Sequence, residues 1–486
     1  MTTSTEPTAT TGSESCNSMR KGTMTDVMIS TIGQKRNTNR VWLEGNMLTR
    51  AGFTPKTRFQ VEAKGGALIL TAQRNGFRQV SQRIRGEREI PIIDINSAEL
   101  LAMFDGLEHV RVIFRQSEIH ILPLASELRA KEREARALAK LASGEALTFG
   151  SLAHGGGVMD DAVEAGFQLQ GLRGELAFAN EIRNDLTEHA IELGRTFGPS
   201  TVALNGKMQE LAFDEYVMRS IGRCDVLTAG LPCSGASVSG RARRGLARAE
   251  SHPEVGHLVV PFLAIIARVN PLAIVLENVE QYQNTASMDI IRSQLRDMHY
   301  ELHESVLNGA EWGAMEHRKR LVMVDVTRGM AFDFNELDRP SFTPGTLADI
   351  LESIPEDDPR WSTMEGLKAK ELRDSEAGKN FAMQVFTAAS DKICTLTKGM
   401  TKNRSTDAKI QHPTNPELLR IPTAVEHARA KQIPEAMIAG LSATTAHELL
   451  GQSVIYRVFV SVGQLLAKSI KALAAPRVEQ VFALVA

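Results

Sequence analysis

From Ala146 onward, short apolar runs of strand length alternate with amphipathic stretches of helix length. Two such stretches, 158–165 and 258–268, separate neighbouring runs. Alternation of this kind predicts a doubly wound α/β sheet, in which ligands bind beyond the carboxyl ends of the strands. We therefore expect functional groups in the loops that follow the strands. The candidate strands are 147–153, 175–178, 201–204, 225–229, 272–276 and 321–326.

The 486 residues exceed what one hydrophobic core usually holds, so two or three domains are expected. Residues 1–25 are Ser/Thr-rich and lack the basic-then-apolar pattern of a signal peptide, which predicts a disordered tail. The segment 126–145 is predicted to be a connecting helix, with the helical pattern over 126–142, Ser126 as its N-cap and Gly144 just past its end. Between them, 26–125 is expected to form a small, mostly β module. Its predicted elements are strands at 39–43, 58–62, 67–71, 110–114 and 118–122 and a helical turn at 47–51.

The remaining chain is predicted to form one main domain with an insertion. The main α/β domain covers 146–330, and the pattern then loosens over 331–395, where Asp, Pro and Ser are frequent. We expect a less regular insert there, a return to the main domain over 396–472 and a C-terminal tail over 473–486.

Charge and cysteine content exclude several classes of protein. The net charge of −2 gives no global attraction to nucleic acid, so phosphate binding must come from local basic patches. The four cysteines show neither zinc-ligand spacing nor a compact disulfide framework, which fits a reducing cytoplasm, and no metal site is expected. The most apolar stretch, 258–276, is interrupted by two prolines and an arginine, so no membrane span is expected.

Three segments carry side chains that complement one another chemically. Pro232 and Cys233 lie in the run 225–237, just after a predicted strand. Glu277 and Asn278 follow the next predicted strand. Arg318 and Arg320 come just before the last one. Taken singly, these are an inert thiol, a strand-end carboxylate and a solvated basic turn. Together, a sulfur nucleophile, a carboxyl group and paired guanidiniums suit addition to an electron-poor ring.

A glycine run follows the first predicted strand. His154, Gly155, Gly156 and Gly157 precede a helix, which would let the backbone approach a cofactor closely. The run lacks the G-x-G-x-x-G spacing of dinucleotide binders and could be a simple turn. Glu181, after the next predicted strand, is the type of carboxylate that binds ribose hydroxyls.

In their order along 147–468, these motifs resemble the bacterial DNA (cytosine-5)-methyltransferases. The blocks that carry the resemblance are 151–160 with 164–167, 230–237, 277–279, 311–320, 420–429 and 451–454. The resemblance implies a Rossmann-like methyltransferase sheet with a target-recognition insert, S-adenosyl-L-methionine as cofactor and double-stranded DNA as partner. It also implies sequence-specific methylation of C5 of a flipped cytosine, in a bacterial, phage or plasmid setting. Two alternatives are open: an enzyme that acts with a cognate restriction endonuclease, and an orphan enzyme.

The resemblance assigns roles to individual residues. Cys233 would attack C6 of the ring, Glu277 would hold and protonate N3, and Asn278 would orient that carboxyl group or the loop. Arg318 or Arg320 would favour the thiolate. The cofactor contacts would be His154, Gly155, Gly156, Gly157, Glu181, Pro232, Gln452 and Ser453, and the DNA contacts Ser237, Arg241, Arg243, Arg244, Lys402 and Arg404. A solvated loop is an equal alternative for the last two.

Several residues depart from the family pattern. Ala153 stands where family members have an aromatic residue over the cofactor. Val158 stands in place of a glycine, and Lys207 in place of an acidic residue. Glu316 and Gln452 stand where Gln and Asn are usual. A DNA-binding regulator with a weakened methylase domain is therefore one alternative, and an RNA cytosine-5 methyltransferase is another.

The N-terminal segment 42–71 resembles the swapped-hairpin modules of AbrB-like regulators and the SymE-type toxin family. That resemblance implies dimerisation and accessory contact with DNA. The alternative is an extension that serves packing or solubility.

Overall fold

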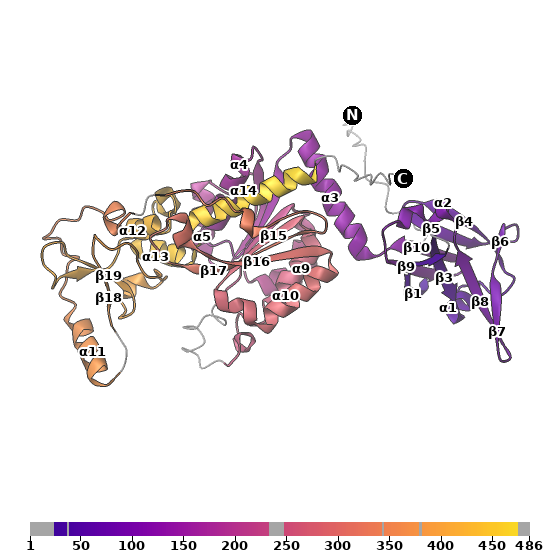
Figure 1. Ribbon diagram of the computed structural model, residues 1–486, viewed down its shortest axis with the longest axis horizontal. Coiled ribbons are helices and arrows are strands. Elements are labelled where there is room, and N and C mark those ends of the chain that lie inside the picture. Colours follow the sequence, from indigo (N-terminus) through magenta and orange to yellow (C-terminus); the bar gives the residue numbers. More distant parts are fainter. Residues whose placement is uncertain (1–23, 36–37, 233–246, 343–344, 379–381, 475–486) are drawn as a thin grey trace, which may run out of the picture. The chain divides into compact units, whose positions relative to one another are not determined.

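The computed structural model describes residues 24–35, 38–232, 247–342, 345–378 and 382–474 (Figure 1). The chain divides into two compact units, 1–129 and 130–486. In the described part, no single helix is both long and apolar enough to cross a membrane. Of the described helices, only the pair α13 (Ala443–Gln452) and α14 (Tyr456–Leu473), bent by 45° at their junction, reaches that length and hydropathy together.

The N-terminal unit is mostly β, as the sequence predicts. One sheet has the strand order β1-β9-β10-β5-β4-β6 and another the order β2-β3-β8-β7, and the two pack around a common apolar cluster. The predicted hairpin is β9 with β10, which pair antiparallel. The elements are β1 (Met24–Thr31), β2 (Gly33–Lys35), β3 (Thr38–Glu44), α1 (Asn46–Arg50), β4 (Arg58–Lys64), β5 (Ala67–Ala72), β6 (Arg78–Gln79), β7 (Ser81–Arg85), β8 (Arg88–Ile95), α2 (Ala98–Leu101), a 3-10 turn (Ala102–Phe104), β9 (His109–Arg115) and β10 (Glu118–Pro123).

Some expectations for this unit were wrong. The strands β1, β2, β6, β7 and β8 were not predicted, and β1 begins at Met24, inside the segment expected to be a disordered tail. β7 contains the residues Ser-Gln-Arg-Ile-Arg and is largely exposed, so it lacks the apolar alternation from which strands are recognised. Its pairing with β8 stabilises it instead.

The C-terminal unit contains the predicted doubly wound sheet. Its strand order is β13-β12-β11-β14-β15-β17-β16, in which β13 to β15 are mutually parallel and β17 is antiparallel to both of its neighbours. The strands are β11 (Leu147–Leu152), β12 (Gly174–Glu181), β13 (Val202–Asn205), β14 (Val226–Gly230), β15 (Ala273–Asn278), β16 (Tyr300–Asn308) and β17 (Lys319–Thr327). The predicted fold class is thereby confirmed, although β16 was not predicted.

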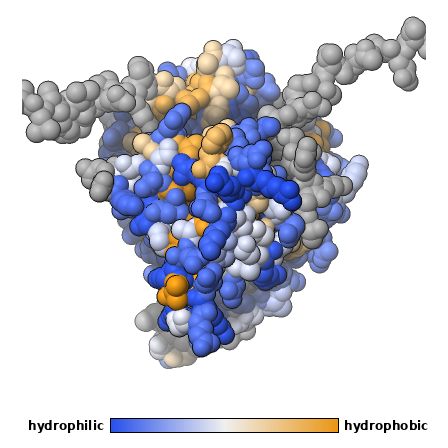
Figure 2. All heavy atoms as spheres, turned by 90° about the vertical axis from the view of Figure 1, so that its right-hand side faces the viewer, coloured by the Kyte–Doolittle hydropathy of each residue, from blue (hydrophilic) through white to orange (hydrophobic). Residues whose placement is uncertain are grey.

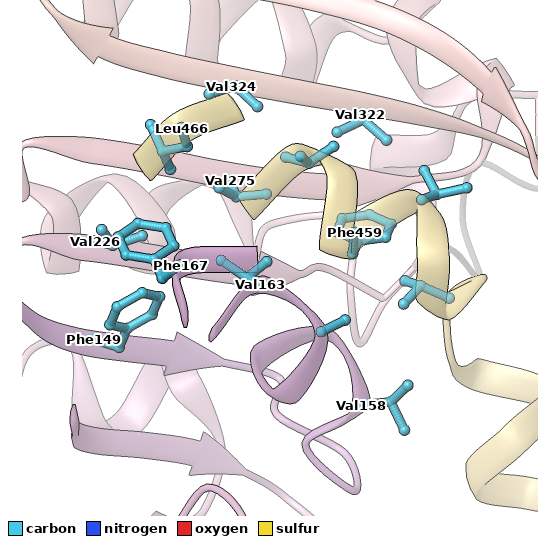
Figure 3. Close-up of a cluster of buried hydrophobic side chains, with 14 of the residues drawn as sticks. Phe149, Val158, Val163, Phe167, Val226, Val275, Val322, Val324, Phe459 and Leu466 are labelled. Atoms are coloured by element: carbon cyan, nitrogen blue, oxygen red, sulfur yellow. The ribbon is translucent and has the colours of Figure 1, made fainter. Parts of the chain in front are cut away.

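Helices cover both faces of this sheet. On one face, α4 (Val158–Leu169) packs along α14 (Tyr456–Leu473), and Val163, Phe167 and Phe459 lie among the sheet residues in Figure 3. A Cβ at Gly166 would lie 2.2 Å from the carbonyl oxygen of Val460, so glycine is required for this close approach. The other face is covered by α9 (Val259–Val269) and α10 (Ala286–Asp297).

The predicted connecting helix is α3 (Ala125–Ser143). It begins before Ser126, so the prediction that this serine is the N-cap was wrong; Gly144 does follow its end, with φ of 72°. Arg133 donates to Thr327 and to the Met298 and His299 carbonyls. Most of the helix is therefore anchored on the C-terminal unit.

The remaining elements lie between and after the strands. The loosely patterned region 331–395 contains α11 (Glu365–Glu376) and β18 (Gln384–Phe386). β18 joins β19 and β20, which follow this region in the sequence, in a small sheet with a separate small core. The remaining described helices and strands of the C-terminal unit are α5 (Asn184–Leu193), α6 (Met208–Leu211), α7 (Glu215–Ser220), β18 (Gln384–Phe386), β19 (Ala408–Gln411), β20 (Leu419–Arg420), α12 (Ala424–Ala430) and α13 (Ala443–Gln452). The 3-10 turns of this unit lie at Ala249–Ser251, Glu280–Asn284, Gly309–Trp312, Phe334–Glu336, Leu347–Asp349, Met400–Lys402 and Glu435–Ile438.

Candidate active site

The carboxyl ends of three neighbouring parallel strands bring the predicted motifs together. β14 pairs with β11 on one side and with β15 on the other. The glycine run therefore follows β11, Leu231 and Pro232 follow β14, and Glu277 and Asn278 end β15. The strand order reverses between β11 and β14, and ligands of doubly wound sheets bind at such a point.

Glu277 is paired with Arg320. Nε of Arg320 lies 3.0 Å from Oε1 of Glu277, and the two side chains are 19% and 11% exposed. The pairing follows from the sheet, because Glu277 lies opposite Val322 in the antiparallel ladder and Arg320 is two residues away on the same face. The carboxylate is thus held in one orientation at the edge of the sheet while a small part of it remains accessible.

Asn278 holds the loop that leads to the predicted nucleophile. Its side-chain amide donates to the carbonyl oxygen of Leu231 at 3.2 Å, and its own oxygen accepts from the backbone N–H of Val279 at 2.8 Å. A pocket beside this loop is lined by Leu231, Pro232, Tyr282 and Ser287, among others. The end of β15 therefore positions the backbone just before Cys233.

Arg318 does not share the position of Arg320. It is buried, its Nη1 lies 3.6 Å from Oε1 of Glu316, and its Nη2 donates to the carbonyl of Gly451 at 3.4 Å. Glu316 is in turn 3.2 Å from Nζ of Lys431, and both of these side chains are fully buried. The two arginines that the sequence pairs are separated: one faces Glu277 and the other anchors the segment before α14.

The thiols of the described cysteines are poor nucleophiles. Cys224 is fully buried, and this burial raises the pKa of its thiol. Burial also raises the pKa of Cys394 to about 11. Because the thiolate is the reactive form, neither residue suits nucleophilic catalysis near neutral pH. Cys233 itself lies outside the described residues, as do Ser237, Arg241, Arg243 and Arg244.

The glycine run and Glu181 meet at the ends of β11 and β12. The backbone N–H of Gly155 donates to Oε2 of Glu181 at 2.7 Å, and Oε1 accepts from the N–H groups of Ile182 and Arg183. A Cβ at Gly156 would lie 2.3 Å from Cδ1 of Leu449 on α13. Gly156 thus packs directly against α13, and a side chain is excluded at that position.

His154 lies beneath this loop. Its Nδ1 is 2.8 Å from Oδ2 of Asp160, which also accepts from Ser151 at 2.7 Å, while Thr228 donates to Oδ1. The His154 side chain is only 1% exposed. The ring therefore ties the loop to α4 and the sheet, and contact of this side chain with the cofactor stays a prediction.

Two further groups of predicted residues lie at or near the surface. At the end of α13, Gln452 donates to the carbonyl of Glu448 and Ser453 donates to that of Leu449. Lys402 and Arg404 are exposed in the segment that precedes β19. Both positions are compatible with the contacts predicted for them, which remain untested.

Sequence reasoning missed two residues of the site. Asn180 donates to the carbonyls of Leu204 and Gly206, each at 2.9 Å, and so fixes the loop after β13. Lys431 compensates the carboxylate of Glu316. The sequence signal that could have identified Lys431 is Glu316, which stands where the family pattern has Gln, because a buried carboxylate requires a cation.

Comparisons with known proteins agree with this arrangement. The model of the family of C-5 cytosine-specific DNA methylases matches residues 162–471. The Type II methyltransferase M1.ScrFI of Lactococcus lactis subsp. cremoris is 26% identical over 242 residues, which are 47% of this chain and 59% of that protein. M.MspI of Moraxella sp is 24% identical over 264 residues, 52% of this chain and 58% of that protein. The matches thus span less than two thirds of either relative.

Solved structures share the fold. The S. pombe Dnmt2 methyltransferase superposes with a TM-score of 0.52 at 18% identity, covering 68% of this chain and 99% of that one. The Entamoeba histolytica methyltransferase EhMeth gives a TM-score of 0.53 at 14% identity, with coverage of 68% and 99%. The sheet is thus the one found in known methyltransferases, and the family match covers well over half of the sequence. The chain belongs to the C-5 cytosine-specific DNA methylase family.

Proposed function

We propose that the chain transfers a methyl group from S-adenosyl-L-methionine to C5 of cytosine within a specific sequence of double-stranded DNA. The observation that carries this proposal is the Arg320–Glu277 pair, because it holds a carboxylate beside the loop that leads to Cys233. The match to the family of C-5 cytosine-specific DNA methylases supports DNA rather than RNA as the substrate.

Cytosine C5 is too weak a nucleophile to take a methyl group unaided. In the proposed reaction the thiolate of Cys233 forms a bond to C6, Glu277 delivers a proton to N3, and the electron pair of the C5–C6 double bond becomes available at C5. After methylation, a base takes the C5 proton, the electron pair of that C–H bond re-forms the C5–C6 double bond, the thiolate of Cys233 leaves C6, and N3 returns its proton to Glu277. Arg320 fixes the carboxyl group of Glu277 so that it meets the ring edge.

The loop after β11 fits the proposed cofactor. Gly155, Gly156 and Gly157 present backbone without side chains at the sheet edge, and Glu181 has lone pairs left to accept ribose hydroxyls. When bound there, S-adenosyl-L-methionine supplies an electrophilic methyl group. Pro232, Gln452 and Ser453 are proposed as its further contacts.

The target atom is inaccessible within a base pair, so the cytosine must leave the stack, which costs a few kcal/mol. We assign the compensating backbone contacts to Ser237, Arg241, Arg243 and Arg244. Lys402 and Arg404, which are exposed, would add phosphate contacts. The choice of sequence is assigned to the insert 331–395.

Transfer of a labelled methyl group to duplex DNA tests the proposal. Purified chain should label the duplex, Cys233→Ser should abolish the transfer, and Cys394→Ser is the matched control because its thiol is held protonated. Bisulfite sequencing of the product should show one recurring sequence. Undiminished transfer by Cys233→Ser would contradict the mechanism.

Cofactor binding separates the enzyme from the regulator alternative. Calorimetry with S-adenosyl-L-methionine should show saturable binding by the unmodified chain. Glu181→Ala should weaken it, because the ribose acceptor and the anchor of Gly155 are lost together. No heat of binding at saturating cofactor would favour the regulator.

A further inference from the structure

A two-stranded ribbon in the N-terminal unit carries unpartnered positive charge. β7 and β8 pair antiparallel and are joined by Gly86 and Glu87, with φ of 64° at Gly86. A glycine at the first position of a two-residue turn is the pattern of a tight hairpin. In Figure 1 the hairpin projects from the rest of the unit, and every residue from 83 to 89 is exposed.

The pairing register gathers arginines on one face of this ribbon. Arg85 lies directly opposite Arg88, and Arg83, two residues before Arg85, lies on the same face. Ile84 pairs with Glu89 on the opposite face. Guanidiniums therefore line one side of the tip, while its only apolar side chain among residues 83–89, 69% exposed, lies on the other.

This arrangement costs stability in the isolated protein. Like charges directly opposite each other across two strands repel. The charge of Arg83 is compensated by Glu44, because Oε1 of Glu44 lies 2.6 Å from Nη2 of Arg83. Among the described residues, Arg85 and Arg88 have no such carboxylate. An anion bound between them would remove the repulsion.

The surrounding sequence favours an extended polyanion. Residues 74–89 contain five arginines and two glutamates, a net charge of +3 in a chain whose total is −2. The surface visible in Figure 2 is largely hydrophilic, with hydrophobic residues only in small groups. A charged ribbon without a broad apolar surface suits phosphate contact better than the burial of a protein partner.

We propose that the tip of the β7–β8 ribbon is a second DNA contact, in which Arg85 and Arg88 hold backbone phosphates of the duplex. The proposal rests on the proposed function, which makes duplex DNA the ligand. The contact lies in the N-terminal unit, outside the segment matched by the methylase family. Because it would read only phosphates, it would add affinity without adding sequence preference.

The expected effect can be stated from counterion release. Each phosphate contact contributes about 0.9 to the slope of log K against log salt concentration. Loss of both arginines should therefore reduce the magnitude of the slope by about 1.8. At 0.1 M salt the same relation gives a loss of up to about eightfold in affinity for each contact, or up to about sixtyfold for both.

The test measures binding of the full chain to a 30-base-pair duplex between 50 and 200 mM KCl. The variant is Arg85→Ala with Arg88→Ala. A matched control, Arg50→Ala with Lys64→Ala, removes two exposed charges of the same unit that lie outside β7 and β8. Ile84→Ser alters the same strand on its opposite face, and Arg85→Lys with Arg88→Lys keeps the charge.

The proposal predicts that the slope of log K against log salt concentration becomes shallower for Arg85→Ala with Arg88→Ala and not for the control variants. The slope for Arg85→Lys with Arg88→Lys should stay close to that of the unmodified chain. An unchanged slope for the ribbon variant would overturn it. An equal change for the control or for Ile84→Ser would also overturn it, because the effect would then be general charge or hairpin distortion. Methyl transfer by the same samples keeps the two proposals apart: an active chain with an unchanged slope refutes the ribbon contact alone, and an inactive unmodified chain refutes the proposed function.

Discussion

The buried pair of Glu316 and Lys431 provides a sharp test of how the site is held together. Nζ of Lys431 lies 3.2 and 3.3 Å from the two carboxylate oxygens of Glu316, and both side chains are fully buried. The remaining cation near Glu316 is Arg318, at 3.6 Å. Lys431→Met removes the ammonium with little change in volume and leaves the carboxylate with the more distant partner.

The expected cost is large because a buried charge is left poorly compensated. Breaking a buried pair by removing one partner typically costs about 3–5 kcal/mol, whereas replacing both charges by neutral groups is often nearly neutral. Lys431→Met should therefore destabilise the C-terminal unit by about 3–5 kcal/mol. The double variant Glu316→Gln with Lys431→Met should recover at least about 2 kcal/mol of this loss.

Urea unfolding at pH 6.5 measures both effects. Tryptophan fluorescence in a Trp42→Phe background reports only the C-terminal unit, and Trp312 is fully buried next to the site, where its carbonyl accepts from Gln432. Lys468→Met is the control, because its pair with Glu336 is largely exposed and should be worth less than about 1 kcal/mol. Equal losses for the two lysine variants would refute the reasoning, and so would a double variant no more stable than Lys431→Met.

Two further predictions concern the same region. Arg320→Ala should lower kcat at least about tenfold while Arg320→Lys retains more activity, because only a cation can hold Glu277; equal rates would argue against that role. Gly156→Ala should weaken cofactor binding in calorimetry, and adding Leu449→Ala should restore part of it, because the new Cβ meets Leu449 at 2.3 Å; unaltered affinity in the single variant would exclude a tightly packed loop.

The sheet was predictable because its central strands are buried on both faces. Strands β11, β14, β15 and β17 are mostly buried and rich in apolar residues, as strands under two layers of helices must be. Strand β16 has His303, Glu304 and Ser305 in its middle and is only partly buried, so its composition did not identify it. The edge strand is instead specified by its antiparallel pairing with β17.

The components of the site were also predictable, but their pairing was not. Spacing placed Arg318 and Arg320 together, since residues two apart share a face of a strand. β17 begins at Lys319, so Arg320 is on the strand opposite Glu277, while Arg318 precedes it and turns to Glu316. Arg318 also donates to the carbonyl of Gly451, which is far away in the sequence, so its orientation could not be read from the spacing of the two arginines.

The N-terminal unit was the least predictable part. Its β7–β8 ribbon is polar and exposed, and only the pairing register shows that Arg85 and Arg88 face each other. A one-residue shift would place them on opposite faces.

Covalent trapping tests the central claim most directly. A duplex that contains the target sequence with 5-fluorocytosine in place of cytosine carries no proton at C5, so the final elimination cannot occur. With S-adenosyl-L-methionine present, the unmodified chain and Cys394→Ser should each form a complex with this DNA that survives denaturation, and Cys233→Ser should form none. A stable complex with Cys233→Ser, or none with the unmodified chain when it methylates ordinary DNA, would contradict the account.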